Sequence, residues 1–125
     1  MLPRQNRLKH MKDWEILMKE GRFVSGKFLN AKVWEIEPDR YPRREYSNND
    51  LKIGFAVGTK VHKSAVKRNR AKRQMREVVR LLLKNKRLKN GYIVAFLPKV
   101  NILDKSYEEI DRAIIEIFKK SKLLI

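Results

Sequence analysis

Several residue types that build catalytic and metal sites are scarce or missing in this chain of 125 residues. Cysteine is absent, which excludes disulfide bonds, thiolate metal ligands and cysteine nucleophiles, and fits a reducing compartment. The two histidines, His10 and His62, follow the spacing of no acid–base or metal-binding motif. The five glycines form no glycine-rich phosphate loop. We therefore expect no catalytic residue and no metal ligand in the protein itself.

Long hydrophobic runs are also missing. No apolar stretch approaches the ~20 residues that a membrane helix needs, and no apolar segment follows the basic N-terminus as in a signal peptide. Hydrophobic residues still make up 42% of the chain, enough for a folded core. The length predicts a single domain, residues 1–125. The missing hydrophobic runs and the missing cysteine predict a soluble, cytoplasmic protein without a membrane partner.

Acidic residues are few relative to basic ones. The chain has 31 lysines and arginines against 14 acidic residues, a net charge of +17. The segment from Lys60 to Arg76 holds eight lysines or arginines and no acid, and Glu77 is the only acidic residue from Lys60 to Gly91. A solvated helix face normally alternates the two signs, because like charges three or four residues apart repel. This segment therefore predicts a polyanionic partner, and nucleic-acid phosphate is the best candidate.

The basic segment predicts a helix from about Ser64, its cap, to Lys86, before a turn at Asn90-Gly91. At about 100° per residue, one apolar arc forms its core face: Ala71, Met75, Val78, Val79 and Leu82. Polar residues lie nearly opposite: Asn69, Arg73, Arg76 and Arg80. We place Arg68 and Lys72 at the border where the helix meets its sheet, and Arg70 on the other flank.

The remaining elements are a helix over about His10–Glu20 that Gly21 ends, strands over Phe28–Ile36, Leu51–Val57 and Gly91–Leu97, and a final helix. Ser106 and Glu109 form a capping box at its start, and its apolar stripe is Ile110, Ala113, Ile114, Ile117 and Phe118. Residues 37–50 contain two prolines and few aliphatics, and predict an exposed loop. The pattern is typical of an α+β or α/β sandwich.

The run AVKRNRAKR, Ala65 to Arg73, with Arg76-Glu77 a turn later, resembles the RNR signature of the bacterial ribonuclease P protein family. Other segments that resemble this family are Asn6–Lys9 with Asp13-Trp14, Ile53–Val57 and Gly91–Val94, so the resemblance covers nearly the whole chain. It implies an α+β fold, a small, ribosomal-protein-like α/β sandwich of order α-β-β-β-α-β-α. It also implies that the basic helix lies in a left-handed strand–helix–strand crossover, against the usual right-handed rule.

The resemblance further implies a protein subunit of ribonuclease P, the ribonucleoprotein endonuclease that cleaves precursor tRNA at its 5′ leader. Catalysis and the Mg²⁺ ions belong to the RNA subunit and substrate, and no obligate protein partner is expected. Matched to the family, the residues expected to bind the RNA subunit are Lys60, Arg68, Asn69, Arg70, Lys72, Arg73 and Arg76. Those expected at the single-stranded leader, in a cleft between the sheet and the first helix, are Trp14, Phe28 and Met18. A stacked base is worth about 1–3 kcal/mol.

Two residues depart from the family pattern. Met18 stands where many relatives have a second aromatic, and Thr59 replaces the first of a common lysine pair. Phe55 is a further candidate platform for a base, although a core position suits it better. A ribosomal-type RNA-binding protein or an RNA chaperone remains the alternative function, since size and charge would look the same. A DNA-binding module ranks third, because no helix-turn-helix or dimerisation pattern occurs.

Overall fold

The computed structural model describes residues 2–125, and its elements follow the expected order α-β-β-β-α-β-α. The helices are α1 (Met11–Glu20), α2 (Ala65–Lys84) and α3 (Tyr107–Lys120). The strands are β1 (Arg22–Val24), β2 (Leu29–Glu35), β3 (Leu51–Phe55) and β4 (Tyr92–Pro98). Short 3₁₀ turns complete the chain: η1 (Arg4–Asn6), η2 (Pro38–Arg40), η3 (Pro42–Arg44) and η4 (Val100–Asp104). This order confirms the predicted α+β architecture.

The four strands form one sheet in the order β1-β2-β4-β3. β2 pairs antiparallel with β1 and β4, whereas β3 and β4 are parallel neighbours. Two parallel neighbours need a crossover, and here it runs through α2, as the resemblance implies. The left hand of that crossover stays a prediction. Of the four strands, β1 had no signal of its own in the sequence, since three residues are too few to show alternation.

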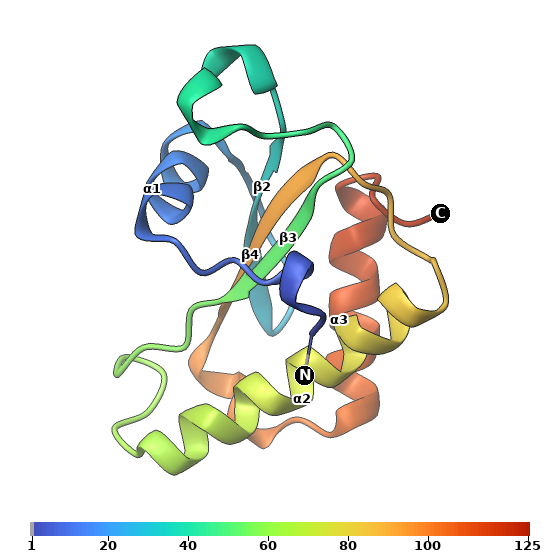
Figure 1. Cartoon of the computed structure of the whole chain (residues 1–125). Coiled ribbons are helices and arrows are strands. Elements are labelled where there is room, and N and C mark those ends of the chain that lie inside the picture. The colour runs from blue at the N-terminus through green and yellow to red at the C-terminus, as the bar shows by residue number, and fades with distance from the viewer. Residues whose placement is uncertain (1) are drawn as a thin grey trace.

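The helices cover the two faces of the sheet unequally: α1 lies on one face, and α2 and α3 lie on the other (Figure 1). The larger core, between the sheet and α2 and α3, includes Ile53, Phe96 and Phe118. The smaller core, under α1, includes Leu17, Trp34 and Ile93. Because β4 has both cores above and below it, its side chains are buried on both faces, as its continuous apolar run predicted. Among the described residues, no helix is long and apolar enough to span a membrane.

Local sequence explains how the two long helices begin and which side they bury. Ser64 caps α2 by accepting a hydrogen bond from the Lys67 amide at 3.4 Å. Ser106 and Glu109 form the predicted capping box of α3, with both hydrogen bonds at 3.2 Å. The buried residues of the two helices are the predicted ones: Ala71, Met75, Val78, Val79 and Leu82 in α2, and Ile110, Ala113, Ile114, Ile117 and Phe118 in α3. Both amphipathic predictions are therefore confirmed.

The segment 37–50, predicted to be an exposed loop, is mostly exposed, and two tyrosines anchor it to the sheet and α1. It contains the turns η2 and η3, and its Tyr41 and Tyr46 rings contact the edge of Trp34 with centroids 5.9 and 5.5 Å apart. The prediction is therefore confirmed for most of the segment, but the sequence did not indicate that Tyr41 and Tyr46 would anchor it. The segment therefore belongs to the structure that supports α1.

Candidate nucleic-acid interface

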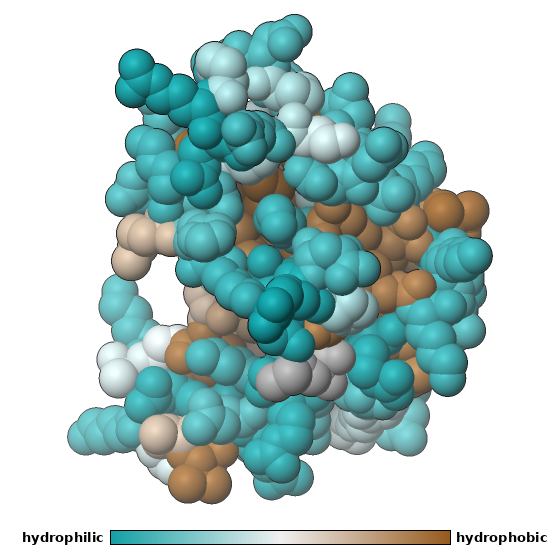
Figure 2. Space-filling view, in the orientation of Figure 1, coloured by the Kyte–Doolittle hydropathy of each residue, from teal (hydrophilic) through white to brown (hydrophobic). Residues whose placement is uncertain are grey.

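The solvent-facing side of α2 carries cations that no acidic residue neutralises. Lys60 lies in the turn before the helix and is exposed, as are Asn69, Arg70 and Arg73. Within residues 2–125 the ion pairs are Lys12–Glu15, Arg40–Glu20, Arg44–Asp13 and Arg80–Glu77, so Arg80 is the only arginine of α2 with an acidic partner. Hydrophilic side chains dominate the face of the molecule that carries α2 (Figure 2). This surface is built to meet anions.

The border residues of α2 are held more firmly than the outer ones. Arg68 and Lys72 are half-buried between α2 and the sheet edge, as the helical periodicity predicted. Arg76, predicted to lie nearly opposite the core face, is half-buried as well and lines the same side as Lys72. The Arg76 Nε donates to the Lys72 carbonyl at 3.4 Å, whereas the Arg68 Nε is buried and has no hydrogen-bond partner among the described residues. A buried guanidinium donor without a partner is costly. We call Arg68, Lys72 and Arg76 the border cations.

A groove of about 240 Å³ follows the free edge of β3 and joins two faces of the molecule. Lys72 and Arg76 of α2 line one side, and Trp14 of α1 lines the other. The groove floor is formed by β3 and the N-terminal segment that crosses it: Leu2, Arg7, Leu8, Lys9, Ile53, Gly54 and Phe55. The edge of β3 is partly covered, because the Leu8 amide donates to the Ile53 carbonyl at 3.1 Å. Lys72, Arg76 and Trp14 thus open onto one groove.

Trp14 is seated on Gly54. A Cβ atom at Gly54 would lie 2.6 Å from Trp14 Cζ2, so only glycine leaves room for the indole ring here. The indole Nε1 donates to the Leu8 carbonyl at 3.2 Å, which fixes the orientation of the half-buried ring. The ring is therefore held in place, with one part of its surface open to the groove.

The residue before Trp14 anchors α1 through a buried carboxylate. Asp13 is 2% exposed and accepts hydrogen bonds from Arg44 Nη2 at 2.7 Å, Arg44 Nε at 3.1 Å and the Tyr46 hydroxyl at 2.6 Å. Burial, and then the hydrogen bond to Asp13, raise the pKa of Tyr46 to about 12, and the same carboxylate raises the pKa of Arg44. A second link joins Glu20 to Tyr41 and Arg40, whose hydrogen bonds lower the pKa of Glu20. Both ends of α1 are thus fastened to the segment 37–50.

α1 covers only part of its face of the sheet. The part of the sheet beside α1 carries small residues, which are Gly54, Ala56 and Ala95. Ala56 is exposed. Met18 lies one helical turn after Trp14 and is 38% exposed. Phe23 of β1 is 59% exposed and pairs with Lys32, which donates to the Met18 carbonyl at 3.4 Å, so both lie on the α1 side. We call Trp14, Met18, Phe23 and Lys32 the α1-side surface. Phe23 and Lys32 had no place in the sequence-based prediction, since only the pairing of β1 brings them to this face.

Phe28, which was expected at the leader together with Trp14 and Met18, lies away from both. Phe28 is 8% exposed, belongs to the core on the α2 and α3 side, and lies beneath the Lys105 ammonium, 4.6 Å from the ring centroid. It precedes β2, where the chain turns its side chain toward the opposite core from Trp14. Phe55 also packs mainly as a core residue, stacked on Phe96 with centroids 5.7 Å apart, although it borders the groove. Its assignment to the core agrees with the sequence analysis.

The two histidines have separate structural settings. His62 Nδ1 accepts a hydrogen bond from the Ser64 amide at 2.9 Å, just before α2, and His10 stands exposed at the start of α1. Among residues 2–125, no three His, Asp or Glu side chains gather in an arrangement that could hold a metal ion. The described side chains thus provide cationic and aromatic surfaces, which suit the binding of a nucleic acid.

Comparison with known proteins agrees with this geometry. The family model described as Ribonuclease P matches residues 2–122. The ribonuclease P protein component of Synechococcus sp. (strain JA-2-3B'a(2-13)) is 34% identical over 125 residues, covering 100% of this chain and 88% of the relative. That of Alkaliphilus oremlandii is 33% identical, covering 95% and 93%.

Solved structures share the fold at lower identity. The Thermotoga maritima ribonuclease P protein has a TM-score of 0.71 at 18% identity, covering 91% of this chain and 96% of its own. A mutant ribonuclease P protein of Staphylococcus aureus has a TM-score of 0.77, also at 18% identity, covering 94% and 89%.

Proposed function

The chain belongs to the bacterial ribonuclease P protein family, and we propose that its two surfaces hold the two RNAs of the reaction. As a ribonuclease P protein component it is a partner of ribonuclease P RNA in the ribonucleoprotein that matures the 5′ end of tRNA. In the proposal, α2 with its border cations binds the RNA subunit, and the α1-side surface binds the single-stranded leader of precursor tRNA.

The unpaired cations of α2 carry the RNA-subunit assignment. Guanidinium groups bind phosphate through paired hydrogen bonds, and Arg68 and Arg73 have no acidic partner in residues 2–125 to compete for them. Exposed Asn69 adds an amide, which can contact a base edge or a ribose hydroxyl. The family relation removes the reason to prefer a ribosomal protein or an RNA chaperone.

The leader assignment is supported by the groove along β3. A single strand leaving the border cations can follow the groove to Trp14 without leaving the protein surface. Stacking tolerates any base, because every base has a π-face, and this suits leaders of varied sequence. Phe23 and Lys32 extend the same surface beyond Met18 with a second aromatic ring and a further cation.

Catalysis, in this proposal, remains with the RNA, which also holds the Mg²⁺ ions together with the substrate. The acidic side chains of the protein fit this assignment of the Mg²⁺ ions to the RNA. They are dispersed or already engaged, since Asp13, Glu20 and Glu77 are paired with arginines. Positive charge near the RNA also lowers the Mg²⁺ concentration that the folded RNA requires, since the cations replace counterions.

Reconstitution with a bacterial ribonuclease P RNA at low Mg²⁺ tests the function. Adding the protein should increase cleavage of precursor tRNA, and unchanged cleavage would contradict the proposal. With about five phosphate contacts, log affinity for the RNA should fall against log salt with a slope of about −3 to −4. Arg73→Ala should make that slope shallower by about 0.7. Arg40→Ala, which removes an arginine already paired with Glu20, should leave it unchanged.

Trp14→Ala tests the leader surface separately. It should weaken binding of leader-bearing precursor tRNA by about 5- to 150-fold, the loss of one stacked base, and spare mature tRNA. Trp14→Phe keeps an aromatic face and should retain most of the affinity. Equal losses for precursor and mature tRNA would show that Trp14 supports the fold and does not contact the leader.

A further inference from the structure

A cavity lies between α2 and the start of α3, and Arg76 is the only lining residue that it shares with the groove beside Trp14. It encloses about 520 Å³, within the range of about 300–1,000 Å³ that small-ligand sites occupy. Five residues of α2 and one of α3 line it: Arg70, Arg73, Gln74, Arg76, Glu77 and Tyr107. Apart from Arg70, Arg73 and Arg76, none of these residues has a place in the RNA contacts assigned above. The cavity thus combines three cations with an aromatic ring, an amide and a carboxylate.

Tyr107 is held in a defined position by the start of α3. It is the first residue of that helix, directly after Ser106, whose capping box with Glu109 fixes the turn. Part of its ring packs against the larger core, and the remainder lines the cavity. Burial, followed by the charges of Asp111 and Glu77, raises the pKa of its phenol, which stays neutral at physiological pH. The cavity therefore contains a rigid, uncharged aromatic surface, a type suited to stacking.

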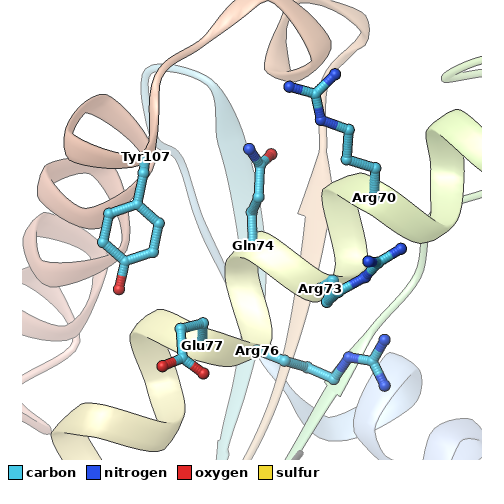
Figure 3. A pocket seen from close by; sticks show the side chains of 6 residues that line it. All are labelled: Arg70, Arg73, Gln74, Arg76, Glu77 and Tyr107. Carbon is cyan, nitrogen blue, oxygen red and sulfur yellow. The ribbon is translucent and has the colours of Figure 1, made fainter.

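The cavity is polarised from one side to the other. Tyr107 and Glu77 lie on one side, the guanidinium groups of Arg70, Arg73 and Arg76 extend on the other, and Gln74 points into the space between (Figure 3). Both Glu77 oxygens accept hydrogen bonds from Arg80, at 2.9 and 2.7 Å, which keeps the carboxylate ionised and lowers its pKa. Because Arg80 neutralises Glu77, an anion would be drawn to the other side of the cavity, where Arg70, Arg73 and Arg76 have no acidic partner among the described residues.

We propose that this cavity binds one unstacked nucleotide of the RNA subunit, with its base on Tyr107 and its phosphate on Arg70 and Arg73. The groups follow one another across the cavity in the order of the parts of a nucleotide. The aromatic ring can stack on a base, the amide can donate and accept at the base edge, and the cations can bind the phosphate. Gln74 can contact any base, because its amide carries both donor and acceptor. The inference rests on the proposed function, since it names a second contact with the same RNA.

The site predicts two separable signatures. Stacking contributes affinity without releasing counterions, whereas a phosphate contact contributes to the salt dependence. Tyr107→Ala should therefore weaken binding to ribonuclease P RNA by about 5- to 150-fold and leave the salt slope unchanged. Arg73→Ala should reduce both the affinity and the slope. Tyr107→Phe keeps the ring and should bind within about twofold of the unmodified protein, which makes it the matched control.

The experiment measures affinity for a bacterial ribonuclease P RNA at several salt concentrations, with circular dichroism to verify the fold of each variant. Gln74→Glu gives a second, nearly isosteric test: a second carboxylate in the cavity should weaken binding at least fivefold without disturbing α2. The nucleotide site is overturned if Tyr107→Ala or Gln74→Glu binds like the unmodified protein, or if Tyr107→Phe loses as much affinity as Tyr107→Ala. If the unmodified protein itself does not bind the RNA, the proposed function fails instead.

Discussion

Replacing Gly54 with alanine tests the seat of Trp14, because the added methyl group would collide with the indole ring. The alanine Cβ would lie 2.6 Å from Trp14 Cζ2 and 2.9 Å from Cη2, and 3.0 Å from Leu8 Cβ. Carbon atoms pack at about 3.5–4.0 Å, so the ring must retreat by about 1 Å. Overpacking of this kind costs about 1–3 kcal/mol, and strain on the hydrogen bond from Nε1 to Leu8 adds about 1 kcal/mol. We expect the free energy of unfolding to fall by about 2–4 kcal/mol.

A double-mutant cycle isolates the contact. In a Trp14→Ala background the ring is gone, and Gly54→Ala should then cost less than about 1 kcal/mol, from the remaining contact with Leu8. Urea unfolding followed by circular dichroism gives the four free energies. Gly58→Ala is the matched control: no atom lies within 4 Å of the added Cβ, so stability should stay level or rise by about 0.4–1 kcal/mol. An equal cost of Gly54→Ala in both backgrounds would refute the seating of Trp14.

Two further predictions concern stability alone. Because the pKa of Tyr46 is raised to about 12 in the fold from 10.0, its contribution is complete below pH 10 and is lost as the pH rises toward 12; at pH 11 the loss is about 1.4 kcal/mol. Urea unfolding at pH 9 and 11 should show a decrease that is smaller by that amount in Tyr46→Phe, and an equal decrease in both proteins would contradict the Asp13 hydrogen bond. Ser106→Ala should lower the unfolding free energy by about 1 kcal/mol, measured by thermal unfolding, while Ser106→Asp, which can cap, should retain it.

Helical periodicity predicted the features that depend only on residues close together in the chain. The side of α2 that is buried and the side that carries Arg73 both follow from a repeat of 3.6 residues, which is independent of what the helix packs against. The same holds for the capping box and apolar stripe of α3. The identity of the cationic surface was therefore available before any tertiary contact was known.

The residues that the sequence analysis misplaced or overlooked all depend on strand pairing or long-range packing. Phe28 and Trp14 looked equivalent as aromatics, but the sheet separates them into opposite cores. Phe23 reaches the α1 side only because β1 pairs with β2 in the register that sets it opposite Lys32. The sequence placed Tyr46 in a polar loop, whereas its hydroxyl donates a hydrogen bond at 2.6 Å to Asp13, which lies 33 positions earlier in the chain.

By itself, the sequence determined the three helices, three of the four strands, the helix faces and the excess of positive charge that calls for an anionic partner. These properties are local or additive, so spacing and composition are sufficient to give them. Only the tertiary structure decided that Trp14 sits on Gly54 in one groove with Lys72 and Arg76, and that Tyr107 closes a separate cavity beside Arg73. Such sites depend on the distances between segments that are remote in the chain. The packing of α1 on the sheet and of α3 on α2 sets these distances.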